Sequence, residues 1–203
     1  MKHPDLEEVL LSGIAPHLIH AAYGNAPGNE LVSGKFFSPE SSSALAANAF
    51  GLFLDRPADL PPLVGCEGLK WPARSVRLEA IVRFPWSGGH HPCLDALVET
   101  EDALIGVESK RYEPFRSKKE ANFSEAYWRP VWGEDMRRYE DLRDRLRARD
   151  VAFSMLDAAQ LIKHAFGLRT AVHRDDKRGK RPVLFYLYAE PARWPDEQPI
   201  DAT

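Results

Sequence analysis

The segment CLDALVETEDALIGVESK, residues 93–110, carries the strongest structural signal in the chain. It contains two mainly apolar stretches, residues 93–99 and 103–110, which predict two strands joined by the short turn Thr100-Glu101-Asp102. Upstream, residues 75–84 largely alternate between apolar and polar side chains, which predicts a strand with one exposed face. Three consecutive strands with short connections predict an antiparallel meander.

Helical patterns lie on both sides of these strands. The predicted helices span residues 6–22, 44–50, 134–149 and 154–167. Gly13 and Pro16 are expected to break the first of them, and Ser154 is expected to cap the last. The apolar run 182–188 predicts a further, buried strand. The order helix-strand-strand-strand-helix-strand predicts an α/β fold with a central mixed sheet and flanking helices.

The length of 203 residues predicts one domain over residues 1–203. We expect its core over about residues 41–188, after an N-terminal helical extension and loop over residues 1–40, with a frayed C-terminal tail over residues 190–203. Thirty acidic and twenty-seven basic residues give a formal net charge of −3, which argues against binding a polyanion through overall charge but leaves room for a local basic patch.

Cysteine content and hydropathy bear on the cellular compartment. Cys66 and Cys93 are too few for a disulfide framework, and we expect free thiols, although one disulfide between them is compatible with the sequence. No apolar run reaches the ~20 residues that span a bilayer. The N-terminus has an acidic pair where a secretory signal would continue its apolar run. These features predict a cytoplasmic protein without membrane contact.

Three polar residues of the predicted meander can act together. Side chains two apart on a strand project from the same face about 6.5–7 Å apart, so Glu108 and Lys110 are neighbours. Asp95 lies on the adjoining strand, and pairing of the two strands can place its carboxylate beside that of Glu108. Adjacent carboxylates repel, so one of them takes a proton or both share a cation such as Mg²⁺. With Lys110 close by, these groups suit phosphodiester hydrolysis.

Asp95 followed by Glu108-Ser109-Lys110, placed on two adjacent strands, resembles the motif of the PD-(D/E)XK phosphodiesterase superfamily, which has a restriction-endonuclease-like core. The resemblance covers roughly residues 41–188, and residues 92–115 look like a little-characterised bacterial branch of that superfamily. The family's usual proline before the aspartate is Leu94 here, which leaves the ligand itself intact.

This resemblance implies a metal-dependent endonuclease with Asp95, Glu108 and Lys110 as catalytic residues. Asp95, Glu108 and the backbone carbonyl of Ser109 would bind Mg²⁺, with Mn²⁺ as a substitute. Relatives often add one more acidic ligand from the first helix or strand, and Glu79 is the best candidate here. The expected partner is nucleic acid, with DNA as the first choice, and cutting of both strands would favour a homodimer.

Substrate contacts are predicted mainly in the segment after the lysine. There, Arg111, Arg116 and Lys118 are interleaved with aromatic residues, a pattern suited to phosphate contact and base stacking. Asn48, on the helix before the strands, can contribute at most hydrogen bonds.

A different interpretation of the same residues is structural. Glu108 and Lys110 could form a solvated pair on an edge strand, and Asp95 could cap a turn. The chain could likewise be a catalytically silent nuclease-like scaffold that binds nucleic acid or regulates another protein, or a metal enzyme acting on another phosphate substrate.

Overall fold

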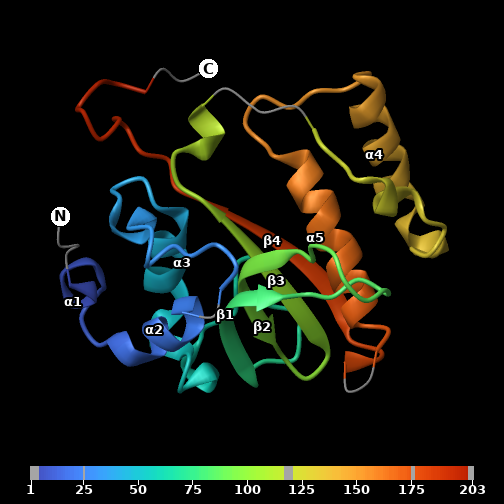
Figure 1. Ribbon diagram of the computed structural model, residues 1–203. Coiled ribbons are helices and arrows are strands. Elements are labelled where there is room, and N and C mark those ends of the chain that lie inside the picture. Colours follow the sequence, from blue (N-terminus) through green and yellow to red (C-terminus); the bar gives the residue numbers. More distant parts are fainter. Residues whose placement is uncertain (1–4, 25, 117–120, 175–176, 201–203) are drawn as a thin grey trace.

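The computed structural model describes residues 5–24, 26–116, 121–174 and 177–200, which form a four-stranded sheet with helices on both faces (Figure 1). The strands are β1 (Ser75–Ile81), β2 (Cys93–Glu99), β3 (Ala103–Lys110) and β4 (Arg181–Tyr188). Neighbouring strands are antiparallel from β1 to β3, whereas β4 runs parallel to β3. The predicted meander, the mixed sheet and the α/β class are therefore confirmed.

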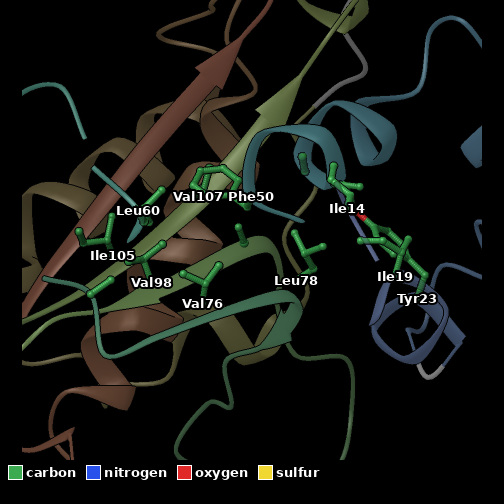
Figure 2. Close-up of a cluster of buried hydrophobic side chains, with 14 of the residues drawn as sticks. Ile14, Ile19, Tyr23, Phe50, Leu60, Val76, Leu78, Val98, Ile105 and Val107 are labelled. Carbon is green, nitrogen blue, oxygen red and sulfur yellow. The ribbon is translucent and has the colours of Figure 1, made fainter. Parts of the chain in front are cut away.

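The N-terminal helices cover one face of the sheet. They are α1 (Leu6–Val9), α2 (Pro16–Gly24) and α3 (Ser42–Phe50), so the predicted break between residues 13 and 16 is confirmed. Figure 2 shows the apolar side chains gathered between these helices and the strands, among them Phe50 and Val107. This burial fixes one side of the sheet.

The other face carries α5 (Ala158–Ala171), and α4 (Arg137–Ala148) packs against α5. The predicted Ser154 cap is wrong, because the side chain of Asp157 accepts the hydrogen bond from the Gln160 amide at 2.9 Å and begins the helix there. The helix also continues beyond Gly167. A Cβ at Gly167 would lie 2.6 Å from Val82 Cγ2, so this glycine permits close packing on the sheet instead of ending the helix.

Shorter turns of 3₁₀ helix connect these elements. They are η1 (Lys35–Phe37), η2 (Gly51–Phe53), η3 (Pro57–Asp59), η4 (Glu113–Phe115), η5 (Glu125–Trp128) and η6 (Glu134–Met136). Cys66 and Cys93 are free thiols, as expected. Within the described ranges, no helix has the length and apolar character needed to cross a membrane.

Two regions differ from the sequence prediction in their packing. The strand β4 is half-buried instead of buried, because it forms an edge of the sheet. The C-terminal segment is not frayed over residues 193–199, where Arg193 and Pro199 form a β-bridge and the ring of Trp194 stacks on Tyr112 with 5.5 Å between centroids. Aromatic stacking thus holds this segment against the end of β3.

The strand β1 changes its buried face at Glu79. Val76 and Leu78 belong to the apolar cluster beneath α3, whereas Ala80 and Val82 pack in the cluster beneath α5. In a regular strand, residues 78 and 80 would share a face. Glu79 has φ of +48°, which is unusual for a residue with a side chain and reverses the alternation at this point.

The strand β2 makes the same change directly opposite. Leu94 packs in the cluster beneath α5, whereas Ala96 lies in the cluster beneath α3. Asp95 stands between them and faces Glu79, which lies between the registered pairs Leu78–Ala96 and Ala80–Leu94. Both strands therefore distort at an acidic residue, and local distortion of this kind often accompanies a functional site.

Close packing of α5 on β3 depends on Gly106, and we expect its replacement by alanine to destabilise the fold by about 1–3 kcal/mol. A Cβ there would lie 2.8 Å from the side chains of both Leu168 and Leu94, which are buried. This overlap outweighs the gain that alanine ordinarily brings to a strand. Urea unfolding measures the change.

The matched control is Gly68→Ala. A Cβ at Gly68 meets nothing within 4 Å, so its effect should stay within about 0.5 kcal/mol. Equal unfolding free energies for the two variants would show that α5 does not constrain Gly106.

Candidate functional site

Asp95 lies where β2 separates from β3. The two strands are paired only from Ala96–Val107 to Glu99–Leu104. Beyond that point the Asp95 carboxylate replaces a backbone acceptor, because its Oδ2 accepts a hydrogen bond from the Ser109 amide at 2.5 Å. This bond brings the carboxylate to the part of β3 that carries Glu108 and Lys110, as the strand pattern predicts.

Glu108 is the most enclosed member of this group, with only 1% of its surface exposed. Its Oε1 accepts a hydrogen bond from Lys110 Nζ. Its Oε2 lies 2.9 Å from Nε2 of His164, a residue of α5 that is itself 2% exposed. The two atoms are not aligned as a hydrogen bond, and neither has another hydrogen-bond partner among the described residues. The interpretation of Glu108 and Lys110 as a solvated surface pair is therefore wrong.

The pKa values of the two carboxyl groups are shifted in opposite directions. Burial and the nearby charge of Glu108 raise the pKa of Asp95 well above its ordinary value. Burial also acts to raise the pKa of Glu108, but its contacts with His164 and Lys110 outweigh burial and hold that pKa below its ordinary value. The two carboxyl groups therefore differ in their affinity for a proton, which Asp95 binds more tightly than Glu108 does.

Lys110 remains a cation in this setting. Burial of its ammonium group acts to lower the pKa of Lys110, but the charges of Glu108 and Asp95 outweigh burial and raise it. Lys110 is therefore suited to stabilise negative charge and not to accept a proton.

His164 is a member of the site that sequence reasoning missed. In the sequence it is a single histidine within the apolar stripe of a helix, which carries no sign of a polar partner. Its position follows from the close contact between Leu168 on α5 and Gly106 on β3. His164 lies one helical turn before Leu168, and Glu108 lies two residues after Gly106, so the same packing places His164 against Glu108. Only the packing of α5 on β3 reveals this pairing.

Glu79 is not gathered with the other two acidic residues into a metal-binding group. Throughout the part of the chain that the structure describes, no three His, Cys, Asp or Glu side chains are arranged to hold a metal ion. The Oε2 atom of Glu79 instead accepts a hydrogen bond from Cys93 Sγ at 3.5 Å, and burial raises the pKa of Glu79. The role of Glu79 as an extra ligand stays a prediction.

The residues predicted to contact substrate occupy different surroundings. Arg116 forms an ion pair with Glu40 at 2.5 Å and lies over the ring of Trp194, so its charge is already partnered. Arg111 has its guanidinium 5.9 Å from the ring centre of Tyr112. Lys118 lies outside the described residues.

Asn48 ties the N-terminal segment to α3. Its amide group donates to the carbonyls of Val9 and Ala44, and its Oδ1 accepts a hydrogen bond from the Leu11 amide at 2.6 Å. These hydrogen bonds use both amide hydrogens of Asn48 within the protein. They do not support contact between Asn48 and a substrate, which stays a prediction.

Asp95 and Glu108 supply carboxylate oxygens that could hold a divalent cation, while the Ser109 carbonyl as a further ligand stays a prediction. The two carboxylates are close enough for the charge of one to raise the pKa of the other, and a cation would relieve that repulsion. In addition, Oε2 of Glu108 is buried with no aligned hydrogen bond among the described residues, and only Nε2 of His164 lies near it, at 2.9 Å. Mg²⁺ typically uses one or two carboxylates and keeps several waters, so these residues fit it.

A cleft of about 430 Å³ adjoins these acidic residues. Residues 90–93 and the first turns of α5 line it, and it is bordered by Tyr127. His164 and Cys93 belong both to its lining and to the contacts of Glu108 and Glu79. A molecule in the cleft would therefore lie one side chain away from the carboxylates.

Comparison with known proteins places the chain beside one described family. The family model described as "Restriction Endonuclease associating with ARP" matches residues 25–197, which include Asp95, Glu108, Lys110 and His164. No curated protein and no solved structure shows a significant match.

Proposed function

Because the chain belongs to the family of restriction endonucleases associating with ARP, which indicates a nuclease, we propose that it is a metal-dependent endonuclease that hydrolyses phosphodiester bonds in DNA. The observation that carries this proposal is the meeting of Asp95, Glu108 and Lys110 where β2 and β3 separate. On this view, the succession α3, β1, β2, β3, α5, β4 corresponds to a restriction-endonuclease-like core.

Asp95, Glu108 and the carbonyl of Ser109 would hold Mg²⁺, or Mn²⁺ in its place. When bound, the cation supplies positive charge to the phosphate and lowers the pKa of a water molecule. His164 contacts the Glu108 carboxylate from the α5 side, and the Ser109 amide donates a hydrogen bond to that of Asp95. These two contacts keep both carboxylates turned toward the same position.

Lys110 has a separate role in the proposed reaction. Its charged ammonium group faces the two carboxylates and would stabilise the negative charge that develops on the phosphate. Since its pKa is raised, Lys110 acts as a cation and hydrogen-bond donor, and the proton of the attacking water goes to solvent or to the phosphate.

Incubation of the purified protein with plasmid DNA, single-stranded DNA and RNA tests this function. We expect cleavage of DNA with Mg²⁺ or Mn²⁺ and none with EDTA, because both carboxylates need a cation to approach a phosphate. Conversion of supercoiled plasmid to nicked and linear forms gives the rate, and linear product formed without nicking would indicate a homodimer that cuts both strands.

Two outcomes would change the proposal. Cleavage of RNA alone would retain the chemistry and replace the substrate. Binding of nucleic acid and metal without cleavage of any substrate would instead favour the silent scaffold that the acidic net charge also permits.

A further inference from the structure

One face of α5 lines the cleft beside the acidic residues. Gln160, Lys163 and His164 lie three and four residues apart, so they share that face. His164 is at the end nearest β3, where it contacts Glu108, and Gln160 is at the beginning of the helix. The cleft therefore extends from His164, which contacts Glu108, along the first turns of α5.

Lys163 places a positive charge in this cleft. Its ammonium nitrogen lies 5.4 Å from the ring centre of Phe123 and 5.7 Å from that of Tyr127. Among the described residues, no carboxylate is within ion-pair distance of it. Burial lowers the pKa of Lys163, and the more distant charge of Asp157 offsets this only in part. A half-buried cation without a close counter-ion is stabilised when an anion enters beside it.

The other groups of the cleft act on an anion in opposite directions. Asp157, the acidic residue in its lining, accepts a hydrogen bond from the Gln160 amide at 2.9 Å as the cap of α5, and its charge opposes an anion. His164, almost wholly buried, has Nδ1 without a hydrogen-bond partner among the described residues. The beginning of a helix adds partial positive charge.

We propose that this cleft binds a backbone phosphate of the substrate strand next to the phosphodiester that is cut, with Lys163 as the cation and Gln160 as a hydrogen-bond donor. This inference rests on the proposed function, because it assumes that the phosphodiester is cut at Asp95 and Glu108. The strand would pass from the carboxylates over His164 to Lys163. Lys163 is a binding residue in this arrangement and takes no part in holding the metal.

Binding of labelled single-stranded and duplex oligonucleotides, measured in EDTA between about 50 and 200 mM salt, tests the site without cleavage. Lys163→Ala should weaken binding about tenfold and reduce the slope of log affinity against log salt concentration by about 0.7–0.9, the value of one phosphate contact. Lys163→Arg, which keeps the charge, should retain most of the affinity.

Arg145→Ala on α4 is the matched control, because it removes one exposed positive charge on another helix. It should change the affinity less than twofold. Thermal unfolding and Mg²⁺ calorimetry should give wild-type values for Lys163→Ala, which separates loss of phosphate binding from loss of the fold or of the metal site.

The outcomes distinguish this inference from the proposed function. Equal affinities and salt slopes for Lys163→Ala, Arg145→Ala and wild type would overturn the phosphate site, even if the wild type cleaves DNA. Absence of oligonucleotide binding by the wild type would overturn it as well. A specific loss in Lys163→Ala, in a protein that cleaves nothing, would support the phosphate site and contradict the nuclease.

Discussion

Lys110→Met is expected to reduce metal-dependent DNA cleavage by about 10²–10³-fold, the effect of removing one preorganised donor to a developing negative charge. Methionine preserves the apolar stem of Lys110 but removes the ammonium group that faces Glu108 and Asp95. The rate of plasmid cleavage at saturating Mg²⁺ measures the loss. We expect it in kcat, because the ammonium group acts on the charge that develops in the reaction.

Two further variants control this prediction. Lys110→Gln, which can still donate a hydrogen bond to Glu108, should lose activity with less change in stability. Lys70→Gln removes a positive charge from the exposed pair with Glu101, where the atoms are 2.8 Å apart, and should cleave at the wild-type rate. Near-normal kcat in both folded Lys110 variants would show that Lys110 is not catalytic.

Asp95→Asn should make the metal-free protein more stable at neutral pH by about 1–3 kcal/mol, while abolishing its stabilisation by Mg²⁺. The side chain of asparagine still offers an oxygen to the Ser109 amide but removes the charge that Glu108 opposes. A variant that gains stability while losing its ligand differs from most substitutions in a buried site. Urea unfolding with and without Mg²⁺ measures both effects.

The pH dependence of this gain follows from the raised pKa of Asp95. The folded protein binds the proton of Asp95 more tightly than the unfolded chain, whose aspartates titrate near about pH 4. The free energy of unfolding is therefore reduced by Asp95 at every pH above about 4. This reduction is complete above the folded-state pKa of Asp95 and diminishes as the pH falls toward about 4. The advantage of Asp95→Asn should shrink over the same range.

Asp141→Asn, at an exposed position of α4, is the control for a lost negative charge and should change stability by less than about 0.5 kcal/mol. If metal-free Asp95→Asn were less stable than wild type at neutral pH, the adjacent carboxylates would not repel each other as inferred.

The acidic residues of the site could be predicted from sequence because they depend on local strand geometry. A strand, a three-residue turn and a second strand place Asp95 near Glu108, and the two-residue period places Lys110 on the same face as Glu108. The presence of the helices was also predictable, since their apolar spacing is a local feature, although the predicted cap and end of α5 were wrong.

The contribution of α5 could not be predicted in the same way. His164 and Lys163 reach the site because Gly106 and Gly167 let the helix lie close to the sheet, and the partners Leu168 and Val82 are distant in the sequence. From sequence, Gly167 is expected to end a helix, as glycine often does. Its actual role is to pack against Val82, which is far away in the sequence, and no local pattern shows that contact.

Long-range contacts also decide which charged residues remain available to a substrate. The sequence pattern predicts that the Arg116 side chain contacts substrate, but Glu40 and Trp194 engage it in the structure. Glu40 precedes the strands in the sequence and Trp194 follows them. The +48° φ of Glu79 likewise arises from the change of face in β1, which no local pattern marks. Tertiary packing therefore determines the surroundings of these residues.

The most direct measurement of the central claim is a crystal structure of the protein soaked with Mn²⁺, with the ion located by its anomalous scattering. The account predicts one strong peak within coordination distance of the Asp95 and Glu108 carboxylates, with the Ser109 carbonyl as a further ligand. Absence of a peak there at saturating Mn²⁺, or carboxylates too far apart to share one ion, would contradict it.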